Sequence, residues 1–259
     1  MSNLNILVFH KVVENAANDW ADVRLALFIQ LLEASKCHKQ KIVSIDSWTE
    51  NNSGELALSF DDGHGSDFDI VLPLLQEYGI QGTFFVAPNY VGKKGYMSWD
   101  QIKTLSEAGM EIGSHSMNHP YMTTLTFEQL LIELEDSKTQ IERHIGKEIV
   151  SFAYPYGDCS ARTHKAAKGA GYKNICTSKP GLCQSTETNL NRNSVHSNIN
   201  LDQLDQLLNP SRMVIFKQQI GYFIRYGLKR VLGVNNYIKL RSGNKDSEEQ
   251  PLLKMENNN

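Results

Sequence analysis

The feature that most constrains the fold is a regular alternation between short apolar runs and segments with helical periodicity. Runs typical of buried strands lie at 5–9, 42–45, 56–60, 81–87, 110–113, 149–153 and 172–176. Apolar spacing predicts helices at 25–36, 68–78, 98–109, 126–146, 160–169 and 201–208. Strands and helices that alternate with short connections require a parallel sheet covered by helices, either doubly wound or closed into a barrel. Because such sheets carry their chemistry at the C-terminal ends of the strands, the residues that follow each strand are the first candidates for a site.

Composition places the chain among globular proteins and excludes some functions. Of 259 residues, 41% are hydrophobic and 21% are charged, and the net charge of −3 leaves no basic excess to attract nucleic acid. The first residues do not resemble a secretory signal, and no apolar stretch approaches the ~20 residues that span a bilayer. A cytoplasmic protein is therefore expected, either free or peripheral to the inner membrane face. The four cysteines form no Cys-x-x-Cys pair, which disfavours a thiolate zinc site.

Two adjacent carboxylates end the predicted strand at 56–60. Asp61 and Asp62 follow its last apolar residue and precede Gly63. Like charges side by side repel each other, and burial would desolvate both, so a fold that keeps them there usually supplies a cation or a shared proton. Asp-Asp-Gly is also ordinary turn composition, so this stretch alone is equally consistent with a solvated turn.

A pair of histidines follows the predicted strand at 110–113. His115 and His119 are four residues apart, which on a helical turn would place both imidazoles on one face. A lone histidine is usually a hydrogen-bonded structural residue. Together with Asp62, however, this pair makes a set of two imidazoles and one carboxylate with open positions for water and substrate. Zn²⁺ accepts such a set, and so do iron and other divalent ions.

Other polar groups accumulate on the same predicted edge of the sheet. Pro155, Tyr156 and Gly157 break the chain directly after a strand. They form either a plain turn or a rigid corner that holds a backbone N–H toward a developing oxyanion. His10 follows the first strand and would line the pocket, although a structural role explains it equally well.

These residues occur in an order and at a spacing that resemble one known family. Ser-Phe-Asp-Asp-Gly at 59–63, His-Ser-Met-Asn-His at 115–119 and Tyr-Pro-Tyr-Gly at 154–157 look like the motifs of the polysaccharide deacetylases, the NodB-homology group of carbohydrate esterase family 4. The resemblance covers roughly residues 4–200. The start of the chain, Ile-Leu-Val-Phe-His-Lys-Val at 6–12, is similar to that of family members associated with exopolysaccharide assembly. The resemblance implies an α/β fold, a distorted (β/α) barrel in a single domain, and a metal-dependent deacetylase of N-acetylated sugars.

The resemblance also implies a role for each matching residue. Asp61 would be the general base, and the backbone N–H of Tyr156 would help to stabilise the oxyanion. Asp62, His115 and His119 would bind a divalent metal ion, with Zn²⁺ as the first expectation. The chemistry agrees with these roles, because an amide carbonyl is a poor electrophile that a metal polarises, while a base takes the proton of the attacking water.

Two more residues complete the expected site. His196 suits the late histidine of the family and would protonate the departing amine, although its neighbours match that motif loosely and a structural role explains it equally well. Many family members carry an arginine two residues before the proline of the third motif, paired with the catalytic aspartate, and here that position is Ala153. Arg192 could supply the missing charge from another strand. We group it with Pro155 and His10 as the expected substrate-binding residues.

The C-terminal part differs in composition from the predicted barrel. We assign 1–210 to the barrel, 211–241 to a basic helical segment and 242–259 to a disordered tail. The segment 211–241 has seven basic and no acidic residues, with apolar residues at near-helical spacing. It is either a final barrel helix with a solvated basic face or an interfacial helix that rests on anionic lipid. Gly221, Gly227 and Gly233 are expected to weaken a continuous helix.

The sequence thus predicts a metal-dependent hydrolase that removes an N-acetyl group from an amino sugar in a glycan or glycolipid precursor. Two alternatives stay open. One is a carbohydrate-binding protein that keeps the barrel without turnover, which Ala153 would favour. The other is a hydrolase of a different C–N amide bond on the same metal. The expected partner is an N-acetylated saccharide, with no nucleic acid, and the interfacial-helix interpretation adds peripheral membrane contact through 211–241.

Overall fold

The computed structural model divides the chain into two compact units, Met1–Gln219 and Ile220–Asn259. It describes residues 3–49, 54–184, 189–233, 236–237 and 240. The predicted tail at 242–259 lies outside the described residues. The predicted end of the barrel at residue 210 falls just before the last long helix, nine residues before the division between the units.

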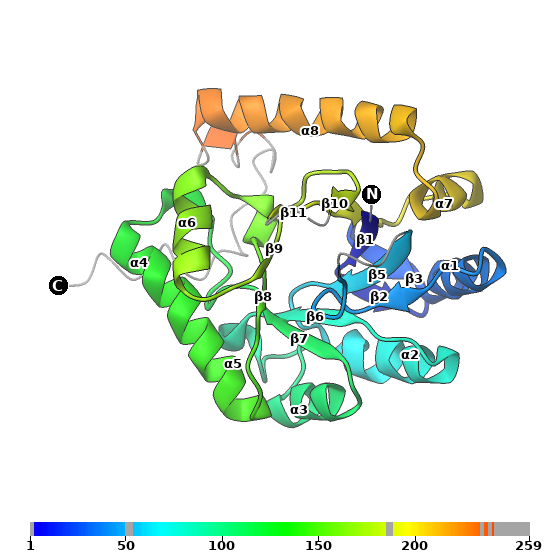
Figure 1. Cartoon of the computed structure of the whole chain (residues 1–259), viewed down its shortest axis with the longest axis horizontal. Coiled ribbons are helices and arrows are strands. Elements are labelled where there is room, and N and C mark those ends of the chain that lie inside the picture. Colours follow the sequence, from blue (N-terminus) through cyan, green and yellow to red (C-terminus); the bar gives the residue numbers. More distant parts are fainter. Residues whose placement is uncertain (1–2, 50–53, 185–188, 234–235, 238–239, 241–259) are drawn as a thin grey trace. The chain divides into compact units, whose positions relative to one another are not determined.

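A sheet of mostly parallel strands forms a nearly closed barrel in the first unit (Figure 1). Its strands run in the order β10–β1–β5–β6–β7–β8–β9–β11. They are β1 Asn3–Phe9, β5 Glu55–Phe60, β6 Thr83–Val86, β7 Glu111–Ser114, β8 Ser151–Ala153, β9 Asn174–Cys176, β10 Cys183–Gln184 and β11 Asn189–Leu190, with β4 Ile42–Val43 beside β5 and β12 Asn193–Ser194 beside β1. A separate parallel pair joins β2 Lys11–Val13 to β3 Asp22–Arg24. The predicted α/β barrel is confirmed.

One short stretch of chain brings the two ends of the sheet together. β11 pairs in parallel with β9, and β12, directly after it, pairs in parallel with β1. Arg192 lies between the two pairings. We call residues 189–194 the closing segment. Sequence periodicity did not reveal it, because each pairing spans two residues, which is too short for an alternating pattern.

Helices pack on the outside of the sheet (Figure 1). They are α1 Leu25–Cys37, α2 Leu72–Tyr78, α3 Trp99–Glu107, α4 Phe127–Leu131, α5 Ser137–Ile145, α6 Ala161–Gly169 and α7 Leu201–Leu208. Single 3₁₀ turns lie at η2 Pro88–Tyr90, η3 Met122–Thr124 and η5 Pro155–Gly157. Two of the predicted helices contain π turns: η1 Asp67–Val71 leads into α2, and η4 Ile132–Asp136 joins α4 to α5. A local widening of this kind leaves the apolar spacing nearly unchanged, so only the overall helical spans were predictable.

The predicted helix boundaries follow from local capping. The side chain of Ser98 accepts a hydrogen bond from the amide of Gln101 at 3.3 Å, and the Gln101 side chain accepts one from the Ser98 amide at 2.8 Å, which is a complete capping box at the start of α3. Gly79 ends α2 with a φ of 65°, and Gly146 ends α5 with a φ of 71°. Glycine adopts this left-handed conformation without the steric cost that a Cβ atom would bring.

Strand residues alternate between two apolar clusters. Leu7 on β1 packs in the larger cluster, under the helices, whereas Ile6 belongs to a smaller cluster with Phe85 and Ala153. Successive side chains of a strand point to opposite faces of the sheet, so the smaller cluster fills the inside of the barrel. The guanidinium carbon of Arg192 lies 5.4 Å from the centre of the Phe85 ring, which places this charged side chain inside as well.

The last long helix, α8 (Arg212–Leu232), is continuous. It passes through Gly221 and Gly227 without a break and ends just before Gly233, which has a φ of 75°. The first two glycines therefore do not interrupt the helix, whereas the third lies at its end. Two single glycines cost about 2 kcal/mol relative to alanine, which the other residues of a helix of this length offset. No helix in the described part of the chain combines the length and the apolarity needed to cross a bilayer.

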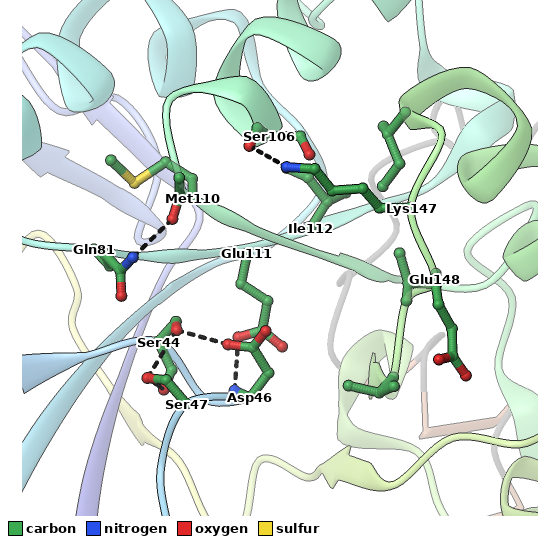
Figure 2. A pocket seen from close by; sticks show the side chains of 14 residues that line it. Ser44, Asp46, Ser47, Gln81, Ser106, Met110, Glu111, Ile112, Lys147 and Glu148 are labelled. Carbon is green, nitrogen blue, oxygen red and sulfur yellow. Dashed lines mark hydrogen bonds between the residues drawn. The ribbon is translucent and has the colours of Figure 1, made fainter.

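A polar cavity lies at the amino ends of β6, β7 and β8, opposite the strand ends that carry the predicted site (Figure 2). Glu111 and Asp46 face each other in it (Figure 2). Both Glu111 oxygens are used: Oε1 accepts from the Ser151 hydroxyl, and Oε2 accepts from the Thr83 hydroxyl at 2.6 Å and from the Asp46 amide at 3.1 Å. Burial, with the nearby Asp46 charge, raises the pKa of Glu111 from 4.5 to about 7.

This raised pKa predicts a pH-dependent stability. Between the ordinary pKa and the raised one, the folded protein holds a proton on Glu111 that the unfolded chain has released, so stability falls as pH rises from about 5 to about 8. The difference corresponds to about 3 kcal/mol. Glu111→Gln keeps a hydrogen-bonding side chain and should flatten the dependence of the unfolding free energy on pH, measured by urea denaturation. Glu148→Gln removes an exposed carboxylate from the same cavity and should leave that dependence unchanged. An identical slope for wild type and Glu111→Gln would contradict the prediction.

Candidate functional site

The two adjacent carboxylates form a sharp corner at the end of β5. The Asp61 amide still donates to the Phe9 carbonyl at 2.9 Å, so this residue remains in the sheet and its carboxylate is buried. Asp62 and Gly63 then both adopt a φ of 75°. A non-glycine residue in the left-handed region is uncommon and strained, and such residues concentrate at functional sites. The burial and the strain disfavour the solvated-turn interpretation of Asp-Asp-Gly.

Asp62, His115 and His119 come together as a compact group of potential metal ligands. Asp62 Oδ1 lies 3.5 Å from His115 Nε2 and 3.2 Å from His119 Nε2. One ligand atom from each residue lies within 4.8 Å of the other two. The sequence predicted this convergence but not its local form, because the histidines lie on an irregular loop after β7 and not on a helical turn. Ser116 and His119 have left-handed φ angles of 62° and 57°, and these turn the second imidazole back toward the first.

The donor set fits a small divalent cation. Zinc with ligands at about 2.0–2.2 Å in tetrahedral geometry requires donor atoms about 3.3 Å apart, close to both separations from Asp62 Oδ1. His115 Nδ1 lies 2.8 Å from the Ala153 carbonyl oxygen, an acceptor that requires Nδ1 to carry the proton. The lone pair of Nε2 is then directed at the cluster, as in metal sites whose histidines donate their other N–H to a carbonyl. Neutral imidazole also suits this place, because burial lowers the pKa of His115 to about 4.

A buried glutamate that sequence reasoning missed holds the histidine loop. Glu133 Oε2 accepts from the amides of Met117 and Asn118 at 2.8 and 2.9 Å, and Oε1 accepts from the Asn118 side chain at 2.7 Å. These bonds fix the loop between the two histidines. Glu133 lies in the π turn η4, within a segment whose apolar spacing predicts only a helix, so no local signal distinguishes it from a solvated helix residue.

Arg192 forms a bidentate ion pair with Asp61. Its Nη1 donates to Oδ1 at 2.6 Å and its Nη2 to Oδ2 at 2.8 Å, while Nε donates to the Thr177 carbonyl at 3.0 Å. The residue is 1% exposed, and its donors are engaged within the protein. The structure therefore places Arg192 where the missing charge was expected, beside Asp61. A guanidinium that is buried and bonded to Asp61 and the Thr177 carbonyl does not face a ligand, which disfavours its grouping with the substrate-binding residues.

Electrostatics keep both aspartates ionised. Burial raises the pKa of Asp61, but the Arg192 charge and its hydrogen bonds outweigh it, so the pKa lies below its usual range. Burial also raises the pKa of Asp62, but side-chain hydrogen bonds from His119 and His64 outweigh this effect and hold the pKa well below its usual range. Two adjacent buried carboxylates can both stay charged here because each has its own cationic or hydrogen-bonding partners.

Tyr156 lies against the histidines, and Pro155 supports it from below the surface. Tyr156 has φ 56° and ψ 12°, which projects its ring outward while Pro155 is buried. The Tyr156 ring is stacked on Tyr121, with centres 4.1 Å apart and an angle of 9° between planes, and meets the His119 ring edge-on at 4.5 Å. Sequence reasoning missed Tyr121, although it lies two residues after His119. Pro155 was expected to bind substrate. Because it is buried, its exposed neighbours would make that contact instead.

His10 and His196 leave neighbouring strands at the same end of the barrel. β12 pairs with β1 in parallel, and the Val195 amide donates to the Val8 carbonyl at 3.0 Å, so the chain reaches His196 beside the exit of β1 at His10. The His10 ring lies 5.6 Å from Trp20. Partial burial lowers the pKa of His196. Neither imidazole belongs to the Asp62–His115–His119 group.

His64 and Asp67 lie close to the ligand group without having been assigned to it. His64 Nε2 is 3.6 Å from Asp62 Oδ2, and its ring stacks on Tyr96 with centres 4.9 Å apart. Asp67, in η1, is buried, and its carboxyl oxygens have no hydrogen-bond partner among the described residues. Burial and the charges of Asp62 and Asp61 raise its pKa well above the usual range, so this third carboxyl takes up a proton more readily than the other two.

Comparison with protein families places this site in a known group. The family model described as polysaccharide deacetylase matches residues 49–175. Over these residues the chain belongs to the polysaccharide deacetylase family. The matched residues include the Asp61–Asp62 corner and both histidines of the ligand group, but they end before Arg192 and His196.

Named relatives match the same part of the chain. It is 34% identical over 126 residues to the peptidoglycan-N-acetylglucosamine deacetylase of Bacillus cereus, covering 48% of this chain and 57% of that protein. It is 30% identical over 147 residues to the peptidoglycan-N-acetylmuramic acid deacetylase PdaA of Bacillus subtilis, covering 55% of this chain and 54% of that protein. The chain thus spans about half the length of the curated relatives it matches.

Solved structures share the fold of the barrel. The deacetylase PplD of Streptococcus pyogenes, in complex with acetate, aligns with a TM-score of 0.74 at 22% identity and covers 80% of this chain and 99% of its own. IcaB from Ammonifex degensii aligns with a TM-score of 0.70 at 20% identity and covers 81% of this chain and 97% of its own. At these identities the likeness establishes the distorted barrel and nothing finer.

Proposed function

We propose that the protein is a metal-dependent hydrolase that removes an N-acetyl group from an amino sugar of a glycan or glycolipid precursor. The observation that carries this proposal is one buried carboxylate, Asp61, held ionised beside a ready-made set of metal donors, Asp62, His115 and His119. Family membership supports the reaction class, since relatives in this family are named as deacetylases of N-acetylated glycans.

Asp62, His115 and His119 would hold the metal ion, and Zn²⁺ fits the mixed imidazole and carboxylate set best. When bound, the ion supplies Lewis acidity that polarises the amide carbonyl and activates water. The contribution of the chain is preorganisation. The Ala153 carbonyl sets the tautomer of His115, and Glu133 fixes the loop that carries His119.

Asp61 would be the general base. Its Oδ2 lies 3.8 Å from His115 Nε2, so its carboxylate borders the metal set without belonging to it. Arg192 keeps this carboxylate charged and fixes its plane, and therefore acts as a positioning residue. A base held in this way can accept the proton of a water that attacks the amide carbon.

Tyr156 and His196 would stabilise the oxyanion and protonate the leaving group, respectively. The left-handed backbone of Tyr156 beside His119 suits a rigid N–H donor for the oxyanion. His196 would protonate the departing amine, because imidazole is the side chain best suited to proton exchange near neutrality and this one lies at the strand ends that carry the metal donors. His10, beside Trp20, would line the sugar-binding side of the pocket.

The non-catalytic alternative loses its main support. Ala153 favoured it because the cation that pairs with the base was missing from the third motif. Arg192 provides that cation from the closing segment, at 2.6 and 2.8 Å from the two Asp61 oxygens. The catalytic interpretation therefore needs no residue that this chain lacks.

His115→Ala tests the metal set. The purified wild type, after zinc add-back, should contain about one ion per chain and release acetate from N-acetylated oligosaccharides. The variant should lose the ion and at least about a hundredfold in acetate release, because one of three protein donors is gone. Metal content is measured by elemental analysis, independently of turnover.

His38→Ala is the matched control. It removes an imidazole that pairs with Asp205 on the protein surface, outside the ligand group, and should retain both the ion and the activity. A wild type that takes up no ion on add-back would overturn the proposed mechanism. A wild type that binds the ion but releases no acetate from any N-acetylated sugar would instead favour hydrolysis of another amide.

A further inference from the structure

Helix α8 exposes an unusually apolar face. Phe216, Ile224 and Val231 are 60%, 58% and 84% exposed, and none of the helix residues is buried. The other exposed large apolar residues of the helix are Met213, Ile220, Phe223, Tyr226, Leu228 and Leu232. Single exposed apolar side chains are ordinary, but so many on one helix mark a contact surface.

Most of these side chains lie on one stripe. Positions 213, 216, 220, 224 and 231 follow each other at steps of three, four or seven residues, which repeat on the same side of an α-helix. The intervening residues Val214, Ile215, Gln218 and Tyr222 are half-buried, so they belong to a different side. We call Met213, Phe216, Ile220, Phe223, Ile224 and Val231 the apolar stripe of α8.

The charge of the helix indicates what covers this stripe. Within α8 there are five basic and no acidic residues, although the whole chain has a net charge of −3. Lys217 and Arg230 border the stripe, where long side chains can lay their methylene stems along an apolar phase and keep their charges in water. The partner must therefore have an apolar interior that can take up the stripe and a negatively charged surface that can face the basic side chains.

We propose that the apolar stripe of α8 binds the surface of an anionic lipid bilayer, with the helix lying parallel to that surface. A bilayer of anionic lipid provides both properties along the whole helix, and a basic amphipathic helix with bulky apolar residues is the usual structure that uses them. A second copy of the chain fits less well, because pairing two α8 stripes would bring together Lys217 and Arg230 of both copies, with no acidic residue in either helix to offset them. The inference is independent of the proposed catalytic activity.

Flotation of the full chain with vesicles tests the inference. The wild type should float with vesicles of phosphatidylcholine and phosphatidylglycerol, and far less with phosphatidylcholine alone. Phe216→Glu/Ile224→Glu should reduce binding to the anionic vesicles by about tenfold or more, since two large apolar contacts are lost. Lys217→Gln/Arg230→Gln should weaken binding at low salt and reduce its salt sensitivity.

A matched control uses an equally exposed apolar pair elsewhere. Phe127→Glu/Ile132→Glu removes side chains that are about half exposed, one in α4 and one in η4, and should bind vesicles like the wild type. Thermal unfolding of each variant checks that the barrel is intact. The proposal is overturned if the wild type does not float, if it floats equally with neutral vesicles, or if the stripe variant binds as the wild type does. It is also overturned if sedimentation shows a wild-type dimer that the stripe variant dissociates, without any vesicle binding.

Discussion

Asp61→Asn is expected to lower acetate release by a factor of about 10² to 10⁴, the usual contribution of a general base, while the metal ion stays bound. The amide keeps the shape of the carboxylate but accepts no proton at neutral pH. The three metal donors are on other side chains, so metal content separates this variant from a ligand mutant. Acetate release within a few-fold of wild type would show that another group is the base.

The same variant leaves Arg192 facing an amide in a buried site. Removing one partner of a buried ion pair costs about 3–5 kcal/mol, because the other charge stays desolvated. Activity should therefore be measured well below the thermal midpoint of the variant, with circular dichroism as a check on folding. Asp136→Asn, which changes an exposed aspartate in η4, serves as the control for the amide substitution itself.

Arg192→Met is expected to move the acidic limb of the pH–activity profile to higher pH. Arg192 lowers the pKa of Asp61, so without it burial is opposed only by the histidines and the carboxylate takes up its proton at higher pH. Near pH 7 a smaller fraction of the base is then ionised, and kcat/KM for acetate release should fall by about tenfold to a hundredfold. Arg192→Lys should restore part of the shift, because lysine keeps the charge but not the two parallel hydrogen bonds.

An exchange variant distinguishes the charge from its position. Arg192→Ala/Ala153→Arg moves the guanidinium to the position where many family members carry it, which here lies inside the same barrel. A return of the acidic limb toward its wild-type pH would show that the requirement is a cation beside Asp61. Arg162→Met, which removes an exposed arginine bound to two backbone carbonyls, should leave the profile unchanged. An unshifted acidic limb in Arg192→Met would contradict the assigned role of the ion pair.

Much of the barrel was predictable, because its strands are long enough to show buried apolar runs and its helices carry caps such as Ser98 and Gly146. The closing segment was not, because two-residue pairings are imposed by tertiary contact and leave no period in the sequence. The π turns were hidden for a related reason, since one widened turn barely disturbs helical spacing.

The candidate site divides in the same way. The ligand group of Asp62, His115 and His119 could be found from residue types that follow strands, because parallel strands deliver their ends to one edge. Arg192 could be inferred only from a need, namely that a buried carboxylate such as Asp61 requires a cation. Glu133 could not be found at all. It holds backbone amides in a loop whose left-handed turns no local pattern indicates.

The closing segment has a mechanical consequence. It is attached to the sheet by two-residue pairings on each side, whereas β1 and β5 share six pairs. A part of the wall joined through so few backbone pairs would open easily if nothing else held it. This segment contains Arg192, however, and opening the barrel there would leave the buried Asp61 carboxylate without its cation. The Arg192–Asp61 ion pair therefore has two effects. It keeps the general base charged, and the same two hydrogen bonds hold the closing segment in the wall of the barrel.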